Sequence, residues 1–161
     1  MLKIYTYGAI DIGSNAIRLI ITDVFQMPDK IQYKKISLIR VPIRLGEDVF
    51  TTGKISPQKL DRFIETMTGF SFLLKAFGVK IFRACATSAM REANNSQEVT
   101  NKILETTGIN IEIISGDEEA FLIQSGGVAE LMNDDKSYLY VDVGGGSTEI
   151  KIGRASCRER V

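Results

Sequence analysis

Two short elements of the sequence combine an apolar run, an aspartate and a glycine-rich turn. They are Ala9 to Asn15 (AIDIGSN) and Tyr140 to Thr148 (YVDVGGGST). Glycines let the backbone approach a ligand closely, so the exposed amides and the Ser or Thr hydroxyls of such turns can bind phosphate oxygens. Asp11 and Asp142 can hold a divalent cation, usually through water. Either element alone is equally consistent with a plain hairpin, but two of them, 131 residues apart (142 − 11), favour a site assembled between two turns.

A third stretch, Ile113 to Ala120, runs from an apolar segment into three consecutive acids. Ser115 and Glu118 have the S-x-x-E spacing of a capping box, and Asp117 suits a first helical turn. Glu119 has no such structural role. Its carboxylate is therefore a candidate general base acting on a water molecule, and a solvated helix face is the alternative.

The segment from Ala86 to Asn95 is a turn of small residues with one arginine. Arg91 can donate two hydrogen bonds to a phosphate, or it can form an exposed pair with Glu92 or another neighbour. The sequence has neither a Walker loop nor a GxGxxG fingerprint. With no histidine and two cysteines, it also lacks the residues of a His-based triad, a His-based zinc site or a disulfide framework. Carboxylates, hydroxyls and backbone amides must therefore supply the chemistry.

The apolar periodicity predicts an α/β fold that positions these residues. A strand hairpin joined across Gly13 to Asn15 and a further β-rich stretch precede a long helix, with Ser56 as N-cap, Pro57 in the first turn and Gly78 after its end. Strand and helix units then alternate, so we expect a mixed sheet with helices on its faces. Glycines and Asp48 predict a loop at 46–53, and Asn95 and Glu98 have capping-box spacing. The expected strands are 7–11, 17–21, 30–43, 79–86, 109–114 and 138–143, and the expected helices are 57–77, 95–107 and 116–132.

The composition is that of a folded globular domain. The 161 residues are 44% hydrophobic and 25% charged, with 20 basic and 20 acidic side chains. The zero net charge gives no global field to recruit nucleic acid or an anionic membrane, and no apolar run reaches the roughly 18 residues of a membrane span. We expect a cytoplasmic protein. Gly153 to Val161 has neither helix nor strand periodicity, and Ile152 to Val161 matches a translated sequencing adapter, so we expect residues 153–161 to be a non-native tail.

Taken together, the motifs resemble the exopolyphosphatase and guanosine pentaphosphate phosphatase family (Ppx/GppA), of the ribonuclease H-like fold in the actin-like ATPase superfamily. The resemblance covers roughly residues 4 to 151, with its motifs in family order. A minor departure is Ala16, where the family often has a hydroxyl residue. The motifs are Asp11 to Asn15 with Arg18, Ala86 to Ala89 with Arg91 and Asn94, Ile114 to Gly116 with Glu118 to Ala120, and Asp142 to Glu149.

The resemblance implies a hydrolase that removes the terminal phosphate of inorganic polyphosphate, of the stringent-response nucleotide guanosine pentaphosphate, or of both. It makes Glu119 the base that activates water and Arg91 the group that neutralises phosphoryl charge. Asp142 and Glu149, together with Asp11 from the first turn, are the expected Mg²⁺ ligands. The expected phosphate-binding residues are Ser14, Asn15, Gly144, Gly145, Gly146, Ser147 and Thr148.

Family members continue into a second lobe of similar fold, and the substrate lies between the lobes. Residues 1–152 are therefore expected to be the N-terminal lobe of a longer Ppx/GppA-like phosphatase, in which homodimers form mainly through parts outside this chain. Neither nucleic acid nor a membrane is an expected partner. Two alternatives stay open: an inactive single-lobe module that binds phosphate or nucleotide, and half of an actin-like or sugar-kinase ATPase.

Overall fold

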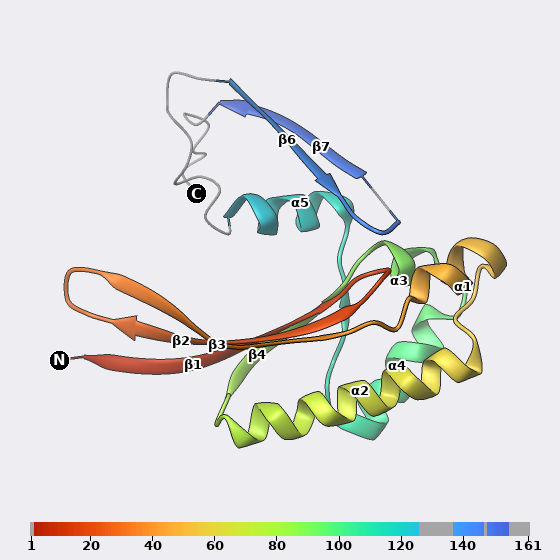
Figure 1. Ribbon diagram of the computed structural model, residues 1–161, viewed down its shortest axis with the longest axis horizontal. Helices are drawn as coiled ribbons and strands as arrows, with labels where there is room; N and C mark the ends of the chain where they lie inside the picture. Colours follow the sequence, from red (N-terminus) through yellow and green to blue (C-terminus); the bar gives the residue numbers. More distant parts are fainter. Residues whose placement is uncertain (1, 126–136, 147, 155–161) are drawn as a thin grey trace.

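A five-stranded mixed sheet forms the centre of the molecule in the computed structural model, which describes residues 2–125, 137–146 and 148–154 (Figure 1). Its strand order is β3-β2-β1-β4-β5. The first three strands are antiparallel neighbours, whereas β4 and β5 run parallel to β1. This arrangement confirms the expected mixed sheet. The strands are β1 (Lys3–Ile12), β2 (Ile17–Gln26), β3 (Ile31–Val41), β4 (Ile81–Ala86) and β5 (Glu112–Ile113).

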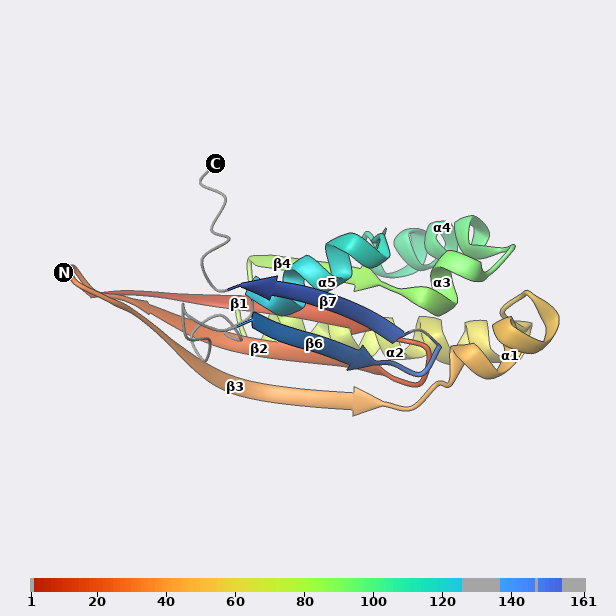
Figure 2. The ribbon, with the colours of Figure 1, turned by 90° about the horizontal axis from the view of Figure 1, so that it is seen from above.

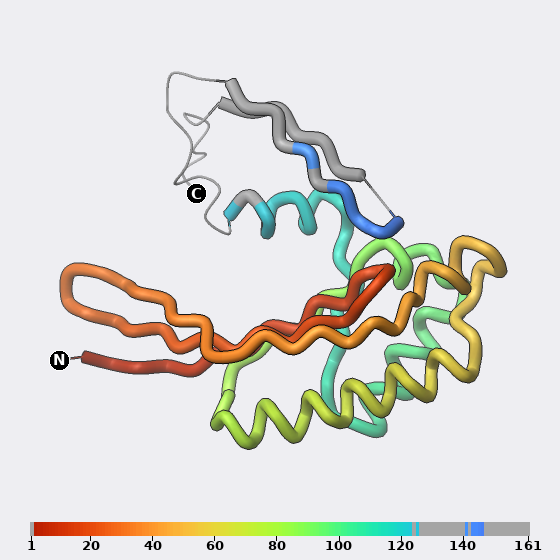
Figure 3. Tube along the Cα trace, in the orientation of Figure 1, coloured from red at the N-terminus to blue at the C-terminus, as the bar shows by residue number. Residues whose placement is uncertain are grey.

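Different elements cover the two faces of this sheet. Helices α2 (Pro57–Ala76) and α4 (Ser96–Thr107) lie on one face, while α5 (Gly116–Ser125) lies over the other (Figures 1 and 2). A second hairpin, β6 (Ser137–Val143) and β7 (Thr148–Arg154), lies on the α5 side. The tube view shows the short helices α1 (Leu45–Thr52) and α3 (Ser88–Glu92) gathered at the end of the sheet where β1 turns into β2 (Figure 3).

The alternation of side chains along the strands separates a core face from a polar face. On β1 the side chains of Ile10 and Ile12 are buried, and on β4 those of Ala84 and Ala86 are buried. They pack against α2, whose apolar stripe is buried as the 3.6-residue period predicts. The intervening residues of both strands point to the side on which α5 lies. One sheet therefore supplies a hydrophobic core and, on its other face, the floor of a polar site.

Helix α2 begins and ends where the sequence predicts. The Ser56 hydroxyl accepts a hydrogen bond from the Lys59 amide at 3.4 Å, and Pro57 opens the first turn. Gly78 follows the helix with a φ of 67°, a left-handed conformation that favours glycine. Capping and the apolar period thus fix this helix locally.

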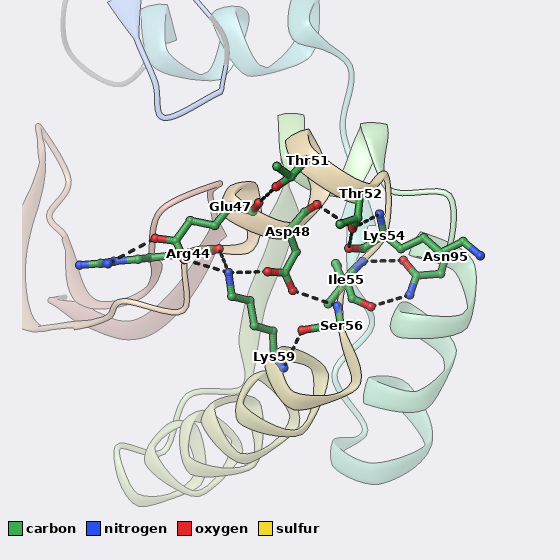
Figure 4. Close-up of polar contacts among 10 residues, drawn as sticks. All are labelled: Arg44, Glu47, Asp48, Thr51, Thr52, Lys54, Ile55, Ser56, Lys59 and Asn95. Atoms are coloured by element: carbon green, nitrogen blue, oxygen red, sulfur yellow. Dashed lines mark hydrogen bonds and ion pairs between the residues drawn. The ribbon is translucent and has the colours of Figure 1, made fainter.

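Helix α1 occupies the segment that was expected to be a loop, so that expectation was wrong. Gly53 ends this helix as its left-handed C-cap, with a φ of 75°, and Asp48 lies in its first turn. Gly46 lies inside the helix, at a position where an added Cβ would be crowded, 3.1 Å from the Ser14 Cβ. Polar contacts from Ser56 and Lys59 hold α1 in place, and Asn95 bonds to the backbone of Ile55 in the segment that follows α1 (Figure 4).

Other boundaries differ in smaller ways. Residues 88–92 form α3 within the expected turn, β5 is shorter than expected, and β7 continues through Arg154 into the segment expected to lack regular structure. Residues 126–132, where the sequence predicts that helix α5 continues, lie outside the described residues, as do Ser147 of the second turn and residues 155–161. Within the described ranges, every helix is too short or too polar to span a membrane.

Candidate functional site

A cleft of about 640 Å³ lies between the sheet, α5 and the turn that joins β6 to β7. It opens at the carboxyl ends of the parallel strands β1 and β4, the edge at which ligands bind in sheets of this kind. Residues of both predicted phosphate turns line it, Ser14 and Asn15 from the first and Gly144 and Gly145 from the second. The structure thus brings together the two turns that lie far apart in the sequence.

The floor of the cleft is a row of side chains set by the strand register. Asp11 on β1 lies opposite Arg18 on β2 and beside Cys85 on β4. The Arg18 guanidinium donates to the Asp11 carboxylate at 3.1 Å, and both side chains are about half exposed. Burial raises the pKa of the Cys85 thiol, so this cysteine stays a neutral thiol at neutral pH. Cys85 therefore adds no charge to the floor, whereas Asp11, Arg18 and Arg83 do.

The first phosphate turn is held rigidly by its neighbours. The Ser14 and Asn15 carbonyls accept hydrogen bonds from the Gly46 and Arg44 amides at 2.8 and 2.9 Å. The Ser14 hydroxyl is buried and lies 2.8 Å from the hydroxyl of Ser88, the first residue of α3. A buried hydrogen bond therefore connects the turn to α3. Ser88 is not among the phosphate-binding residues predicted from the sequence, although it lies in the run of small residues that begins at Ala86.

The second turn packs closely against the first. A Cβ added at Gly145 would lie 3.5 Å from the Ser14 Cβ, which is ordinary contact. At Gly146 it would overlap the ring of Phe50, on α1, and lie 2.9 Å from the Ser14 Oγ. A side chain at position 146 would therefore have to displace the Phe50 ring, so space favours glycine there. Phe50 is a further neighbour of the site that the sequence did not reveal, because its role depends on where α1 packs.

The predicted base and the predicted arginine are in direct contact. The Arg91 Nη1 donates to the Glu119 Oε2 at 2.9 Å and to the Ile114 carbonyl at 2.9 Å. Both side chains are largely buried, with 25% and 16% of their areas exposed, and Glu119 lines the cleft. Glu119 therefore does not lie on a solvated helix face, and Arg91 pairs with it. This ion pair joins α3 to the first turn of α5 at the edge of the cleft.

Glu118 has the structural role that its spacing indicated, by a partly different contact. Its amide donates to the Ser115 hydroxyl at 3.1 Å, as a capping box requires. Its carboxylate, however, accepts from the Arg83 guanidinium at 2.7 Å. Adjacent acids thus have different partners, and Glu119 is the one whose side chain lines the cleft.

The sequence and structure comparisons support the same assignment. The sequence profile of the Ppx/GppA phosphatase family matches residues 24–160. The chain belongs to the Ppx/GppA phosphatase family. It is 35% identical over 151 residues to exopolyphosphatase 2 of Mycobacterium tuberculosis, covering 91% of this chain and 47% of that protein. It is 32% identical over 150 residues to a bifunctional 3-dehydroquinate synthase/phosphatase of Fusobacterium nucleatum, covering 91% of this chain and 23% of that protein.

Solved Ppx/GppA structures share the fold. The crystal structure of an exopolyphosphatase from Cytophaga hutchinsonii superimposes with a TM-score of 0.83 at 32% identity, covering 94% of this chain and 47% of that one. The Aquifex aeolicus family member gives a TM-score of 0.78 at 28% identity, with 95% and 48% covered. These matches confirm the predicted family and fold. The chain spans about half the length of these structures.

The described donors suit a hard divalent cation. Asp11 lines the cleft and offers carboxylate oxygens, the ligands such cations prefer. Asp142 and Glu149 are register partners in β6 and β7, directly before and after the second turn; their side chains lie outside the described part of the structure. Among the described side chains, no group of three His, Cys, Asp or Glu is gathered tightly enough to hold a metal by itself. This donor set fits an ion held by one or two carboxylates, with water and substrate phosphates as further ligands.

Proposed function

We propose that this Ppx/GppA lobe, completed by a second lobe, hydrolyses the terminal phosphoanhydride of inorganic polyphosphate, guanosine pentaphosphate or both, in the presence of Mg²⁺. The observation that carries the proposal is the Arg91–Glu119 pair at the rim of a cleft formed by two glycine-rich turns. Exopolyphosphatase relatives and membership of the phosphatase family support polyphosphate as a substrate. The same membership disfavours half of a sugar-kinase ATPase as an alternative.

The chemistry assigns a separate task to each group. Glu119 accepts a proton from water as the water oxygen bonds to the terminal phosphorus and the bridging P–O bond breaks. Arg91 holds the carboxylate in place and offsets negative charge on the phosphoryl oxygens. The turns at Ser14–Asn15 and 144–148 bind the remaining phosphates. Asp11, Asp142 and Glu149 are the proposed ligands of Mg²⁺, which when bound neutralises charge on the substrate.

The proposal is tested by phosphate release from the two-lobed protein and its Glu119→Gln variant. Removing a general base lowers turnover by roughly 10² to 10⁴-fold. Asp117→Asn is the matched control, since Asp117 is an exposed acid two residues away in the same helical turn. Equal turnover of Glu119→Gln and the parent protein would contradict the assignment of the base. Running each protein on polyphosphate and on guanosine pentaphosphate identifies the substrate.

Removal of the metal tests the cofactor. Chelation is expected to stop phosphate release, and added Mg²⁺ is expected to restore it. Restoration by Mn²⁺ but not by Mg²⁺ would contradict the choice of metal. The cytoplasmic location and the homodimer of a longer chain stay predictions from the sequence.

A second candidate function is a binding module without turnover. It is favoured by the cleft itself, because both glycine-rich turns that line it belong to this chain. Calorimetry on the 161-residue chain is the direct test. Binding of polyphosphate by this chain without release of phosphate would support the module, whereas no heat of binding to polyphosphate or guanine nucleotides would exclude it.

A further inference from the structure

Arg83 on β4 joins three elements at the floor of the cleft. Its Nε and Nη2 atoms donate to the Glu112 Oε2, on β5, at 2.8 and 2.6 Å. Its Nη2 also donates to the Glu118 Oε1, in the first turn of α5, at 2.7 Å. The guanidinium therefore links a central strand of the sheet to its edge strand and to the helix that carries Glu119. None of the sequence motifs had singled it out.

Arg83 and Arg91 hold consecutive acids of α5 from two different elements. Arg91, at the end of α3, fixes the Glu119 carboxylate, and Arg83, on β4, fixes the Glu118 carboxylate. Two side chains that leave successive positions of a helix point about 100° apart, so anchors on both define the rotation of the helix about its axis. One anchor alone would leave α5 free to roll about that contact.

The chemistry of the link requires an arginine. Hydrogen bonds to Glu112 and Glu118 raise the pKa of Arg83, and the hydrogen bond from Arg83 lowers the pKa of Glu112, so Arg83 and Glu112 both stay charged near neutral pH. A planar guanidinium can reach carboxylates on two elements at once, whereas a lysine offers a single point charge. The expected consequence of a lysine at position 83 is therefore a partial link.

We propose that Arg83 is a positioning residue, which sets the rotation of α5 and thereby keeps Glu119 at the cleft. This inference rests on the proposed function, because it gives Arg83 its importance through the base that it positions. A direct contact with substrate phosphate is the competing role, since Arg83 lines the cleft and 42% of its side chain is exposed. The two roles predict different kinetics.

The test compares four variants of the two-lobed protein: Arg83→Met, Arg83→Lys, Glu118→Gln and the double variant Arg83→Met/Glu118→Gln. If Arg83 acts through Glu118, either single change lowers kcat about tenfold with KM changed less than twofold, because a small misplacement of a catalytic group is costly. The double variant is expected to be no slower than Arg83→Met, since both changes break one link. Arg83→Lys should regain part of the loss. Arg62→Met is the control. Arg62 is an exposed arginine of α2, the helix that lies on the face of the sheet opposite α5.

Other kinetic outcomes would overturn the inference. A rise in KM for Arg83→Met with kcat and Glu118→Gln unchanged would make Arg83 a substrate-binding residue. If Arg83→Met has a lower melting temperature but an unchanged kcat per folded molecule, Arg83 only stabilises the fold.

Hydrogen exchange separates failure of this inference from failure of the proposed function. The α5 amides are expected to exchange at least fivefold faster in Arg83→Met and Glu118→Gln than in Arg62→Met. Because this readout needs no turnover, it decides whether Arg83 holds α5 even if the parent protein releases no phosphate. Unchanged exchange together with unchanged kcat would sink the inference while leaving Glu119 as the base.

Discussion

Two clusters in the molecule place cations among acids, and they do so in different surroundings. In the Lys59 cluster (Figure 4), Lys59 on α2 lies 2.9 Å from Asp48 and 3.1 Å from Glu47, both on α1, and donates to the Arg44 carbonyl at 2.6 Å. In the cleft cluster, defined as Arg83, Glu112, Glu118, Arg91 and Glu119, each cation joins elements distant in the sequence.

The difference lies in which backbone each cluster restrains. The Lys59 cluster holds the start of α1, where Arg44 adopts a left-handed φ of 58° that costs a non-glycine residue energy. The cleft cluster restrains α5, and one of its acids lines the cavity. We infer that the Lys59 cluster mainly contributes to stability and the cleft cluster mainly to activity.

Of the changes that test this difference between the two clusters, Arg91→Met in the two-lobed protein is expected to have the largest effect on activity. The change removes a cation beside the proposed base, so we expect kcat to fall roughly 100-fold. Because Glu119 is then left largely buried without its cation, the melting temperature should fall as well, and kcat is compared per folded molecule. A protein that unfolds cooperatively at a much lower temperature, with normal kcat in its folded fraction, would erase the distinction between the clusters.

Lys59→Met is expected to have the opposite profile. It leaves Asp48 and Glu47 without their shared cation and frees the Arg44 carbonyl, so we expect the free energy of unfolding to fall by about 2 kcal/mol. Urea denaturation measures this loss. Lys54→Met is the control, because the Lys54 side chain is exposed in the same region. If both lysine variants are equally stable, the cluster contributes nothing.

The smallest expected effect is a change in how stability depends on pH. Burial alone would raise the pKa of Asp48, but hydrogen bonds with Ser56 and Lys59 outweigh it and lower the pKa. A lowered pKa gives stability that is present above the ordinary value of about 4 and is lost as the pH falls through the value in the folded protein. Asp48→Asn should therefore lose about 1 kcal/mol at pH 7 and show a shallower decline below about pH 4. Denaturation of both proteins across this range makes the comparison, and parallel curves would contradict it.

The sequence predicted much of the site because its signals are local. Glu119 was predicted to be the base because the capping-box spacing of Ser115 and Glu118 already gives the neighbouring Glu118 a structural role. The glycine-rich turns were evident from their composition. Arg83 and Phe50 could not be found in this way, because their importance depends on contacts with residues 35 and 96 positions away (118 − 83 and 146 − 50). Ser88 belongs to the same class.

The fold was predictable to the same degree and for the same reason. Helix α2 has its cap, its proline and its period within its own sequence. Helix α1 has glycines that look like loop signals, but one of them, Gly46, packs closely against Ser14. Asn95 has the spacing of a cap, but its amide group exchanges two hydrogen bonds of 3.0 Å with the Ile55 backbone. Long-range partners decided both cases.

The register between β1 and β4 couples the cleft to the hydrophobic core, so that a folded molecule also has an intact cleft. Adjacent residues of a strand face opposite sides, so Ala84 and Ala86 enter the core only when Arg83 and Cys85 face the cleft. A slip by one residue would exchange the two sets, and a chain that lost the cleft floor would lose its core as well. A protein preparation should therefore contain folded molecules with an intact cleft and unfolded chains, but few folded molecules that lack the cleft. The fraction of chains that bind a tight phosphate analogue should equal the fraction that is folded.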